Sequence, residues 1–279
     1  MTGATISEKN MREGSPRSVL ETLFHGALIA FFFLLPLQTR YIFREVALYE
    51  YGTVSLYGIE ILGWVVIVLG TLSKLSFGWE KLSVRRVNVI LIGLLVLSFL
   101  SIFWSPDKLV ALQGAMRLFE GVLLLSILPT TYYILRPAIV WAFLAGATLQ
   151  AGLGIYQFFS QSSFSSTLFG MALHDPQMPG TFVVEFGDQR WLRAYGGLPH
   201  PNVLGGYLVV AMVIGVMMLQ KAADGYKKLL LRIINVVLIT GIFFSFSRAA
   251  WLGAALMIAC WGVHSLRVRI IRDFFYVLL

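Results

Sequence analysis

Charged residues are scarce in this chain, and their scarcity decides which class of protein to expect. Asp, Glu, Lys and Arg make up 13% of the 279 residues, whereas hydrophobic residues make up 58%. A soluble domain usually carries about 25% charged residues. The apolar residues fall in runs long enough to cross a bilayer. The composition therefore excludes an ordinary soluble domain and predicts an all-α, polytopic membrane protein.

Cysteine and histidine are also rare. The single cysteine, Cys260, excludes an intrachain disulfide. The four histidines are His25, His174, His200 and His264. They do not have the spacing of metal ligands, so neither a metal nor another cofactor is expected.

A net charge of +8 is typical of nucleic-acid-binding proteins as well as of membrane proteins. Here the positive residues stand in short loops between apolar runs, where the positive-inside rule places them. Nucleic acid is therefore not expected as a partner, whereas membrane lipids are.

The apolar runs predict eight membrane-spanning helices and the start of a ninth. Residues 1–19 are expected to be a disordered cytoplasmic tail, and 20–279 a single membrane domain. The start of the ninth run, 274–279, is far shorter than the roughly twenty residues of a full span, which predicts a truncated chain. The eight spans are expected at about 20–37, 53–72, 88–104, 108–128, 138–159, 203–219, 233–246 and 249–263.

The distribution of Lys and Arg predicts the orientation of these spans. With the N-terminus in the cytoplasm, the inner segments hold 15 of the 22 basic residues and the outer segments hold 6. This bias places the longest polar segment, 160–202, on the outer face of the membrane. A loop of this length is usually functional or disordered.

Arginines on the outer face run against this bias, so they are the candidate substrate-binding residues. A guanidinium group binds phosphate oxygens through two parallel hydrogen bonds and stays charged at any relevant pH. Alternatively, these arginines pair with lipid headgroups or with nearby acids such as Glu45, Glu50, Glu185 and Asp188. The candidates are Arg40, Arg44, Arg190, Arg193 and Arg248.

Four other polar residues also have candidate roles. His200, between two prolines, is either a general base, a substrate contact or a cap of the following helix. Asn202 is predicted to be the N-cap of the helix that begins at Val203. Arg117 and Glu120 lie three residues apart within a span, and such a pair either serves function or ties the bundle together.

Four motifs, in their order and spacing, resemble those of the O-antigen ligase and polymerase family. The first two are Pro36-Leu-Gln-Thr-Arg40 and Trp104-Ser-Pro-Asp107, where Ser-Pro-Asp is a predicted turn and helix start. The third is Arg193-Ala-Tyr-Gly-Gly-Leu-Pro-His-Pro-Asn-Val-Leu-Gly-Gly-Tyr-Leu208, and the fourth is Phe246-Ser-Arg-Ala-Ala-Trp-Leu-Gly253. The resemblance covers most of the chain from about residue 20.

This resemblance implies a glycosyltransferase of the bacterial inner membrane. Such enzymes transfer a glycan from an undecaprenyl diphosphate-linked donor to an acceptor on the periplasmic side, which is a glycolipid, another glycan or a protein. The family's arginine on the donor diphosphate corresponds to Arg193. Its usual catalytic histidine lies in a later periplasmic loop, beyond the spans seen here. The alternatives are a transporter or flippase of lipid-linked sugars, and a non-catalytic assembly protein.

Overall fold

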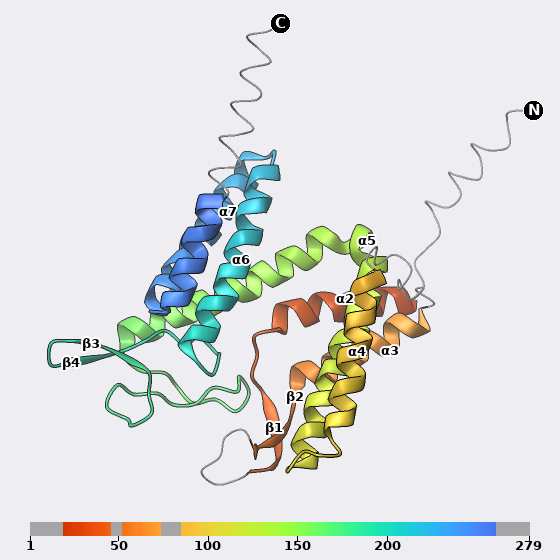
Figure 1. Ribbon diagram of the computed structural model, residues 1–279. Helices are drawn as coiled ribbons and strands as arrows, with labels where there is room; N and C mark the ends of the chain where they lie inside the picture. The colour runs from red at the N-terminus through yellow and green to blue at the C-terminus, as the bar shows by residue number, and fades with distance from the viewer. Residues whose placement is uncertain (1–18, 46–51, 74–84, 261–279) are drawn as a thin grey trace, which may run out of the picture. The chain divides into compact units, whose positions relative to one another are not determined.

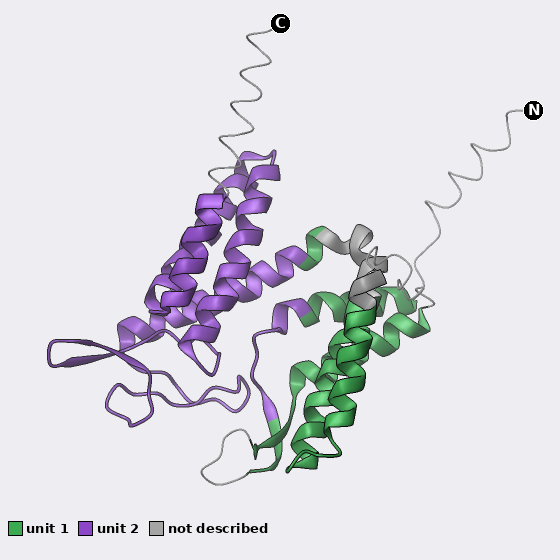
Figure 2. Ribbon diagram, in the orientation of Figure 1, with its two compact units in different colours: residues 1–31, 41–139 green, residues 32–40, 140–279 purple. Residues whose placement is uncertain are grey.

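The computed structural model describes residues 19–45, 52–73 and 85–260, and for 85–88 and 127–136 it describes the backbone only. The chain forms two compact units (Figure 2). Unit 1 comprises residues 1–31 and 41–139, and unit 2 comprises 32–40 and 140–279. Most of the predicted cytoplasmic tail and the start of the ninth span lie outside the described residues.

Unit 1 is built from helices and one small sheet (Figure 1). Its helices are most of α2 (Val19–Leu34), α3 (Gly58–Leu72), α4 (Arg85–Ser101) and the first part of α5 (Lys108–Ser160). Its two-stranded sheet pairs β1 (Arg40–Arg44) with β2 (Val54–Tyr57). The core comes from α2, α3 and α5, with Phe24, Leu28, Val66 and Ala115 almost fully buried.

The turn before α5 starts the helix as predicted. One carboxylate oxygen of Asp107 accepts hydrogen bonds from the backbone N–H groups of Leu109 and Val110, at 3.1 and 3.2 Å. These are two of the N–H groups that a helix start leaves without a partner.

The predicted ion pair between Arg117 and Glu120 is wrong. The Arg117 guanidinium forms its ion pair with Glu60 of α3 instead. Glu60 is already fixed at the start of α3, because its other oxygen accepts a hydrogen bond from the backbone N–H of Tyr57 at 3.0 Å. A carboxylate held in place by the backbone binds the guanidinium at a smaller cost in side-chain entropy.

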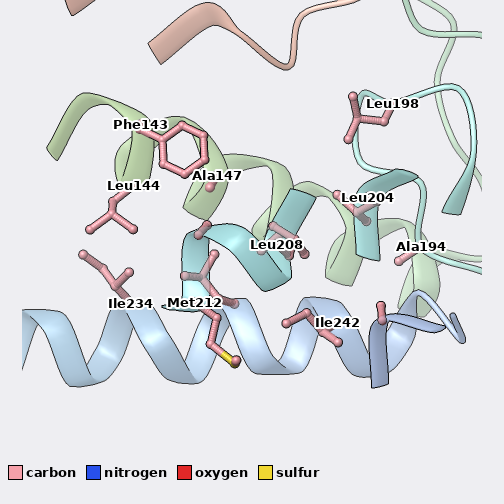
Figure 3. Packing of buried hydrophobic residues seen from close by; sticks show 14 of the residues in the cluster. Phe143, Leu144, Ala147, Ala194, Leu198, Leu204, Leu208, Met212, Ile234 and Ile242 are labelled. Atoms are coloured by element: carbon pink, nitrogen blue, oxygen red, sulfur yellow. The ribbon is translucent and has the colours of Figure 1, made fainter. Parts of the chain in front are cut away.

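Unit 2 contains the second part of α5, α6 (Pro201–Lys221), α7 (Gly225–Phe244) and a further helix, Arg248–Cys260. Figure 3 shows apolar side chains of α5, α6 and α7 pointing toward one another in a shared core. Leu144, Leu204, Leu208 and Leu238 are fully buried there. This packing holds the helices that carry the polar loop.

The segment between α5 and α6 is ordered. It contains a hairpin in which β3 (Val183–Phe186) pairs antiparallel with β4 (Gln189–Leu192), so that Glu185 lies opposite Arg190. This connection runs from the end of α5 at Ser160 to the start of α6 at Pro201, within the predicted segment 160–202.

Three helical segments among the described residues are long and apolar enough to cross a membrane. They are Lys108–Ser126, Pro137–Ser160 and Pro201–Lys221, and they match the predicted fourth, fifth and sixth spans. Four shorter apolar helices are Val19–Leu34, Gly58–Leu72, Val89–Ser101 and Arg248–Cys260. The chain is therefore a helical protein with membrane-spanning character, as its composition predicts.

One predicted boundary is wrong. The sequence predicts separate spans at 108–128 and 138–159, but α5 is helical from Lys108 to Ser160, through Pro129 and Pro137. A proline removes one backbone donor and disfavours the helix, yet membrane helices tolerate it when neighbouring groups satisfy the freed carbonyl.

Candidate functional site

The loop from Arg193 to Asn202 is held by two glutamines of α5. Gln157, fully buried, accepts a hydrogen bond from the Tyr195 N–H at 3.1 Å and donates one to the Gly196 carbonyl at 2.8 Å. Gln150, also buried, accepts a hydrogen bond from the Gly197 N–H at 2.5 Å. The two glutamines are seven residues apart, so they lie on one face of α5. They satisfy backbone groups that the buried turn would otherwise leave unpaired.

Gly196 is the position in this turn that requires glycine. Its φ is +60°, a conformation that other residues adopt only at a cost. A Cβ atom there would lie 2.8 Å from the Gln150 side-chain oxygen. The backbone conformation and the close approach of Gln150 therefore both exclude a side chain.

Gly196→Ala is expected to destabilise unit 2 more than Gly187→Ala does. Gly187, in the β3–β4 turn, also has a φ of +60°, but no atom lies within 4 Å of its Cβ position. Gly187→Ala should cost only the backbone strain, about 1–2 kcal/mol, whereas Gly196→Ala adds a collision with Gln150 of about 1–3 kcal/mol. Thermal unfolding of the two purified variants measures the difference. Equal midpoints would show that Gln150 does not hold the turn.

Arg193 is fixed by two hydrogen bonds from its guanidinium group. Its Nε donates to the Ser245 carbonyl at 2.8 Å, and one Nη donates to the Asn202 side-chain oxygen at 2.7 Å. The next residue is tied to the same turn, because the Ala194 N–H donates to the Phe244 carbonyl at 2.9 Å. The half-buried guanidinium is therefore positioned by the start of α6 and the end of α7.

The structure brings Arg193 and Arg248 together. Burial lowers the pKa of Arg193 below its ordinary value, and the positive charge of Arg248 lowers it further. Arginine nevertheless stays protonated at neutral pH. Among the described residues no carboxylate forms a salt bridge with either arginine, so two positive charges share this end of unit 2 without a counter-ion.

His200, not Asn202, is the N-cap of α6. Its Nδ1 accepts the backbone N–H of Asn202 at 2.9 Å, and the helix begins at Pro201. Asn202 is the second helical residue, and its side chain accepts from Arg193 instead. The prediction that Asn202 caps the helix is therefore wrong. The proline is the first helical residue, two positions earlier than the predicted start at Val203.

The hydrogen bond at His200 Nδ1 also bears on its suggested role as a base. Burial, and after it the positive charge of Arg193, lower the pKa of His200. A neutral imidazole whose Nδ1 accepts a hydrogen bond carries its proton on Nε2. The remaining ring nitrogen is thus a donor, which favours a substrate contact over a general base.

Aromatic side chains also hold the loop through Tyr195. The buried Tyr195 hydroxyl accepts a hydrogen bond from the Phe182 N–H at 2.7 Å, and the His174 ring stacks on the Tyr195 ring with centroids 4.1 Å apart. The Phe182 ring in turn lies 3.9 Å from the His200 ring. These contacts order the segment before Arg193.

Three other candidate arginines occupy different surroundings. Arg190 lies in β4 opposite Glu185, half-exposed, and its buried Nε has no hydrogen-bond partner among the described residues. Arg44, in unit 1, forms a salt bridge with Asp107 and donates to the Gly52 carbonyl at 3.2 Å. Arg40 is exposed at the first position of β1. None of the contacts described for unit 2 joins Arg40 or Arg190 to Arg193.

An apolar pocket lies beside the same turn. Its volume is about 320 Å³, and its lining includes Gly197 of the anchored loop and Gln150, the α5 residue that holds it. The rest of the lining is mostly apolar and includes Phe33, Leu149, Leu153, Phe164, Phe169 and Met171. Unit 2 thus contains both the two arginines and an apolar pocket, and Gly197 of the anchored loop lines that pocket.

The described residues contain no group of three or more His, Cys, Asp or Glu that could hold a metal ion. No family model, curated protein or solved structure matches this chain. The site offers a fixed guanidinium group at Arg193, a second one at Arg248 and a histidine N–H to an anion.

Proposed function

We propose that the chain binds a polyprenyl diphosphate-linked glycan and takes part in its transfer to an acceptor. The observation that carries this proposal is the pair Arg193 and Arg248, two positive charges with no carboxylate partner among the described residues. A diphosphate supplies the missing negative charge and can accept hydrogen bonds from both guanidinium groups. The family resemblance of the sequence motifs supports the same substrate class.

The apolar pocket supports a lipid-linked substrate over a soluble one. The isoprenoid part of the donor needs an apolar surface, and the diphosphate needs the arginines. Both lie beside the turn Gly196–Gly197 in unit 2. An amphiphile therefore matches this surface better than a free sugar phosphate does.

The proposed chemistry is displacement at the sugar carbon that carries the diphosphate. The glycosidic C–O bond to the diphosphate breaks, an acceptor oxygen forms the new bond, and the acceptor's proton goes to a base. Arg193 and Arg248 would stabilise the charge that develops on the leaving diphosphate. His200 would donate its Nε2–H to a diphosphate oxygen rather than accept the acceptor's proton.

The direct test is binding of farnesyl diphosphate to the purified protein in lipid nanodiscs. Farnesol, which has the same chain without the diphosphate, is the matched control. The proposal requires farnesyl diphosphate to bind more tightly, and requires added salt to weaken that preference. Equal affinities for farnesyl diphosphate and farnesol would show that the protein does not recognise the diphosphate, and would contradict the proposal.

The orientation and the full set of eight spans in a bacterial inner membrane are part of the same proposal. The charge bias predicts that the exposed Asp188 of the hairpin faces outward. With Cys260→Ser as background, Asp188→Cys should react with a membrane-impermeant thiol reagent in intact cells. Ala223→Cys, exposed between α6 and α7, should react only after permeabilisation. The reverse pattern would invert the topology.

A flippase or transporter of lipid-linked sugars is the second candidate. The observation that favours it is the group Glu60, Arg117 and Glu120, in which Arg117 and Glu120 lie within a candidate membrane span. Ionisable residues at that depth are typical of transport pathways. Movement of a labelled lipid-linked sugar across a proteoliposome membrane, without glycan transfer, would favour this candidate.

A further inference from the structure

Unit 1 holds an intramembrane group of three ionisable residues that the proposed diphosphate site does not use. Arg117 forms an ion pair with Glu60, donates to the Ser55 carbonyl at 3.1 Å and lies 5.1 Å from the centre of the Tyr57 ring. Both carboxylate oxygens of Glu60 have partners, since the second one accepts a hydrogen bond from the Tyr57 N–H. Arg117 and Glu60 therefore neutralise each other.

Glu120, the third member, has no such partner. Its side chain is 7% exposed, and no described residue donates a hydrogen bond to it or forms a salt bridge with it. It lies against Gly63 of α3, where a Cβ atom would collide with the Glu120 carboxyl oxygen. The glycine thus leaves room for the carboxyl group between two packed helices.

The net charge of this group determines whether Glu120 is protonated. Two carboxylates share one guanidinium, so a fully ionised group would bury one unpaired negative charge inside a membrane span. An unpaired charge at that depth costs several kcal/mol, whereas a neutral carboxylic acid costs far less. A bound proton removes the excess charge.

Among the side chains that the structure describes, Arg117 is the one cation that acts on Glu120. On α3 the facing ionisable group is Glu60, and on α5 it is Arg117. From α2, Phe31 approaches Gly63, and the ionisable residues of that helix, Glu21 and His25, stand further toward its start. The α4 segment Val89–Ser101 contains no ionisable residue.

We propose that Glu120 is a proton-binding site within the membrane, next to the Glu60–Arg117 ion pair. The ligand is a single proton, and its release leaves the group of three with one net negative charge. This site is independent of the arginines in unit 2. It gives the chain a means of responding to protons that glycan transfer alone does not require.

Dicyclohexylcarbodiimide tests the proposal, because this apolar reagent modifies protonated carboxyl groups in membranes. The reagent adds to the carboxylic acid, and the adduct rearranges to a stable N-acylurea that peptide mass spectrometry locates. In the full chain in nanodiscs at neutral pH, Glu120 should be modified and Glu60 should not. The rate should fall as the pH is raised. Modification of Glu60 alone, or of neither residue, would overturn the proposal.

Glu60→Gln provides the sharpest control. Glutamine can still accept the Tyr57 N–H hydrogen bond but releases Arg117 from its ion pair. Arg117 would then pair with Glu120, three residues further along α5, and keep it ionised. Modification of Glu120 should fall at least fivefold in this variant. An unchanged rate would show that the charge balance does not set its protonation.

Two further measurements keep the test independent of folding. Glu120→Gln should lose the infrared carbonyl band of a protonated carboxylic acid that the wild-type protein shows, with an unchanged gel-filtration profile. Sodium ions at fixed pH should not protect Glu120 from the reagent. Saturable protection by sodium would show that the site binds a metal cation rather than a proton, and would overturn the proposal. The absence of the infrared band from the wild-type protein would overturn it as well.

Discussion

Arg193→Ala is expected to weaken the binding of farnesyl diphosphate at least tenfold, which corresponds to about 1.4 kcal/mol. The guanidinium group is held by the Ser245 carbonyl and the Asn202 side chain, so its remaining N–H groups have a fixed direction. A fixed donor loses little entropy when it binds an anion. In an assay that measures transfer, the same variant should lose at least tenfold, since the contact strengthens as charge develops on the leaving group.

Lysine and a distant arginine provide the controls for Arg193. Arg193→Lys should restore only part of the affinity, because an ammonium group keeps the charge but not the planar pair of donors. Arg232→Ala removes one positive charge from an exposed position on α7 and should leave the affinity unchanged. If Arg193→Ala binds as the wild type does, or loses binding only because it unfolds, the assignment of Arg193 is wrong.

Gly205→Ala is expected to destabilise unit 2 by closing the space between α6 and the residues that follow α7. Its Cβ atom would lie 2.8 Å from the Ala250 Cβ, 2.9 Å from the Ser245 hydroxyl and 3.0 Å from the Ser247 Cβ. Small residues at such a contact let helices approach closely in a membrane. Since three neighbours close the space, we expect the variant to lose about 1–3 kcal/mol, the usual cost of overpacking.

The neighbouring glycine is a matched control for this loss. Gly206 lies in the same helix, and no atom lies within 4 Å of its Cβ position. Gly206→Ala should therefore gain the helix propensity of alanine, about 1 kcal/mol, and should raise the thermal unfolding midpoint. A midpoint for Gly205→Ala as high as that of Gly206→Ala would contradict the close packing at Ser245 and Ala250.

Much of the fold follows from patterns within the sequence. Apolar runs predict the three long membrane segments, and Ser-Pro-Asp predicts the start of α5, because both signals act between residues close in sequence. The continuation of α5 past Pro129 and Pro137 was not predicted. The satisfaction of backbone groups freed by a proline depends on tertiary neighbours, which local patterns do not specify.

The sequence predicts the charged residues of the candidate site but not the groups that hold them in place. Arg193 and Arg248 stand out because the charge bias predicts that they lie on the outer face, where positive charge is disfavoured. The roles of Gln150 and Gln157 were missed, since a glutamine in an apolar helix can hydrogen-bond to any neighbouring segment and local patterns do not specify which one. Their spacing of seven was the signal available. The Ser245 carbonyl gives no signal at all, because every residue has one.

The hydrogen bond from Arg193 to Ser245 has a consequence for how the protein is made. These residues are separated by 52 positions, whereas Arg193 and Asn202 are separated by nine. A growing chain therefore exposes Arg193 and Asn202 well before Ser245 leaves the ribosome. The arginine is first held from one side only, and it gains its second support after α7 has been synthesised. Nascent chains arrested before Ser245 would carry the loop without a competent anion site.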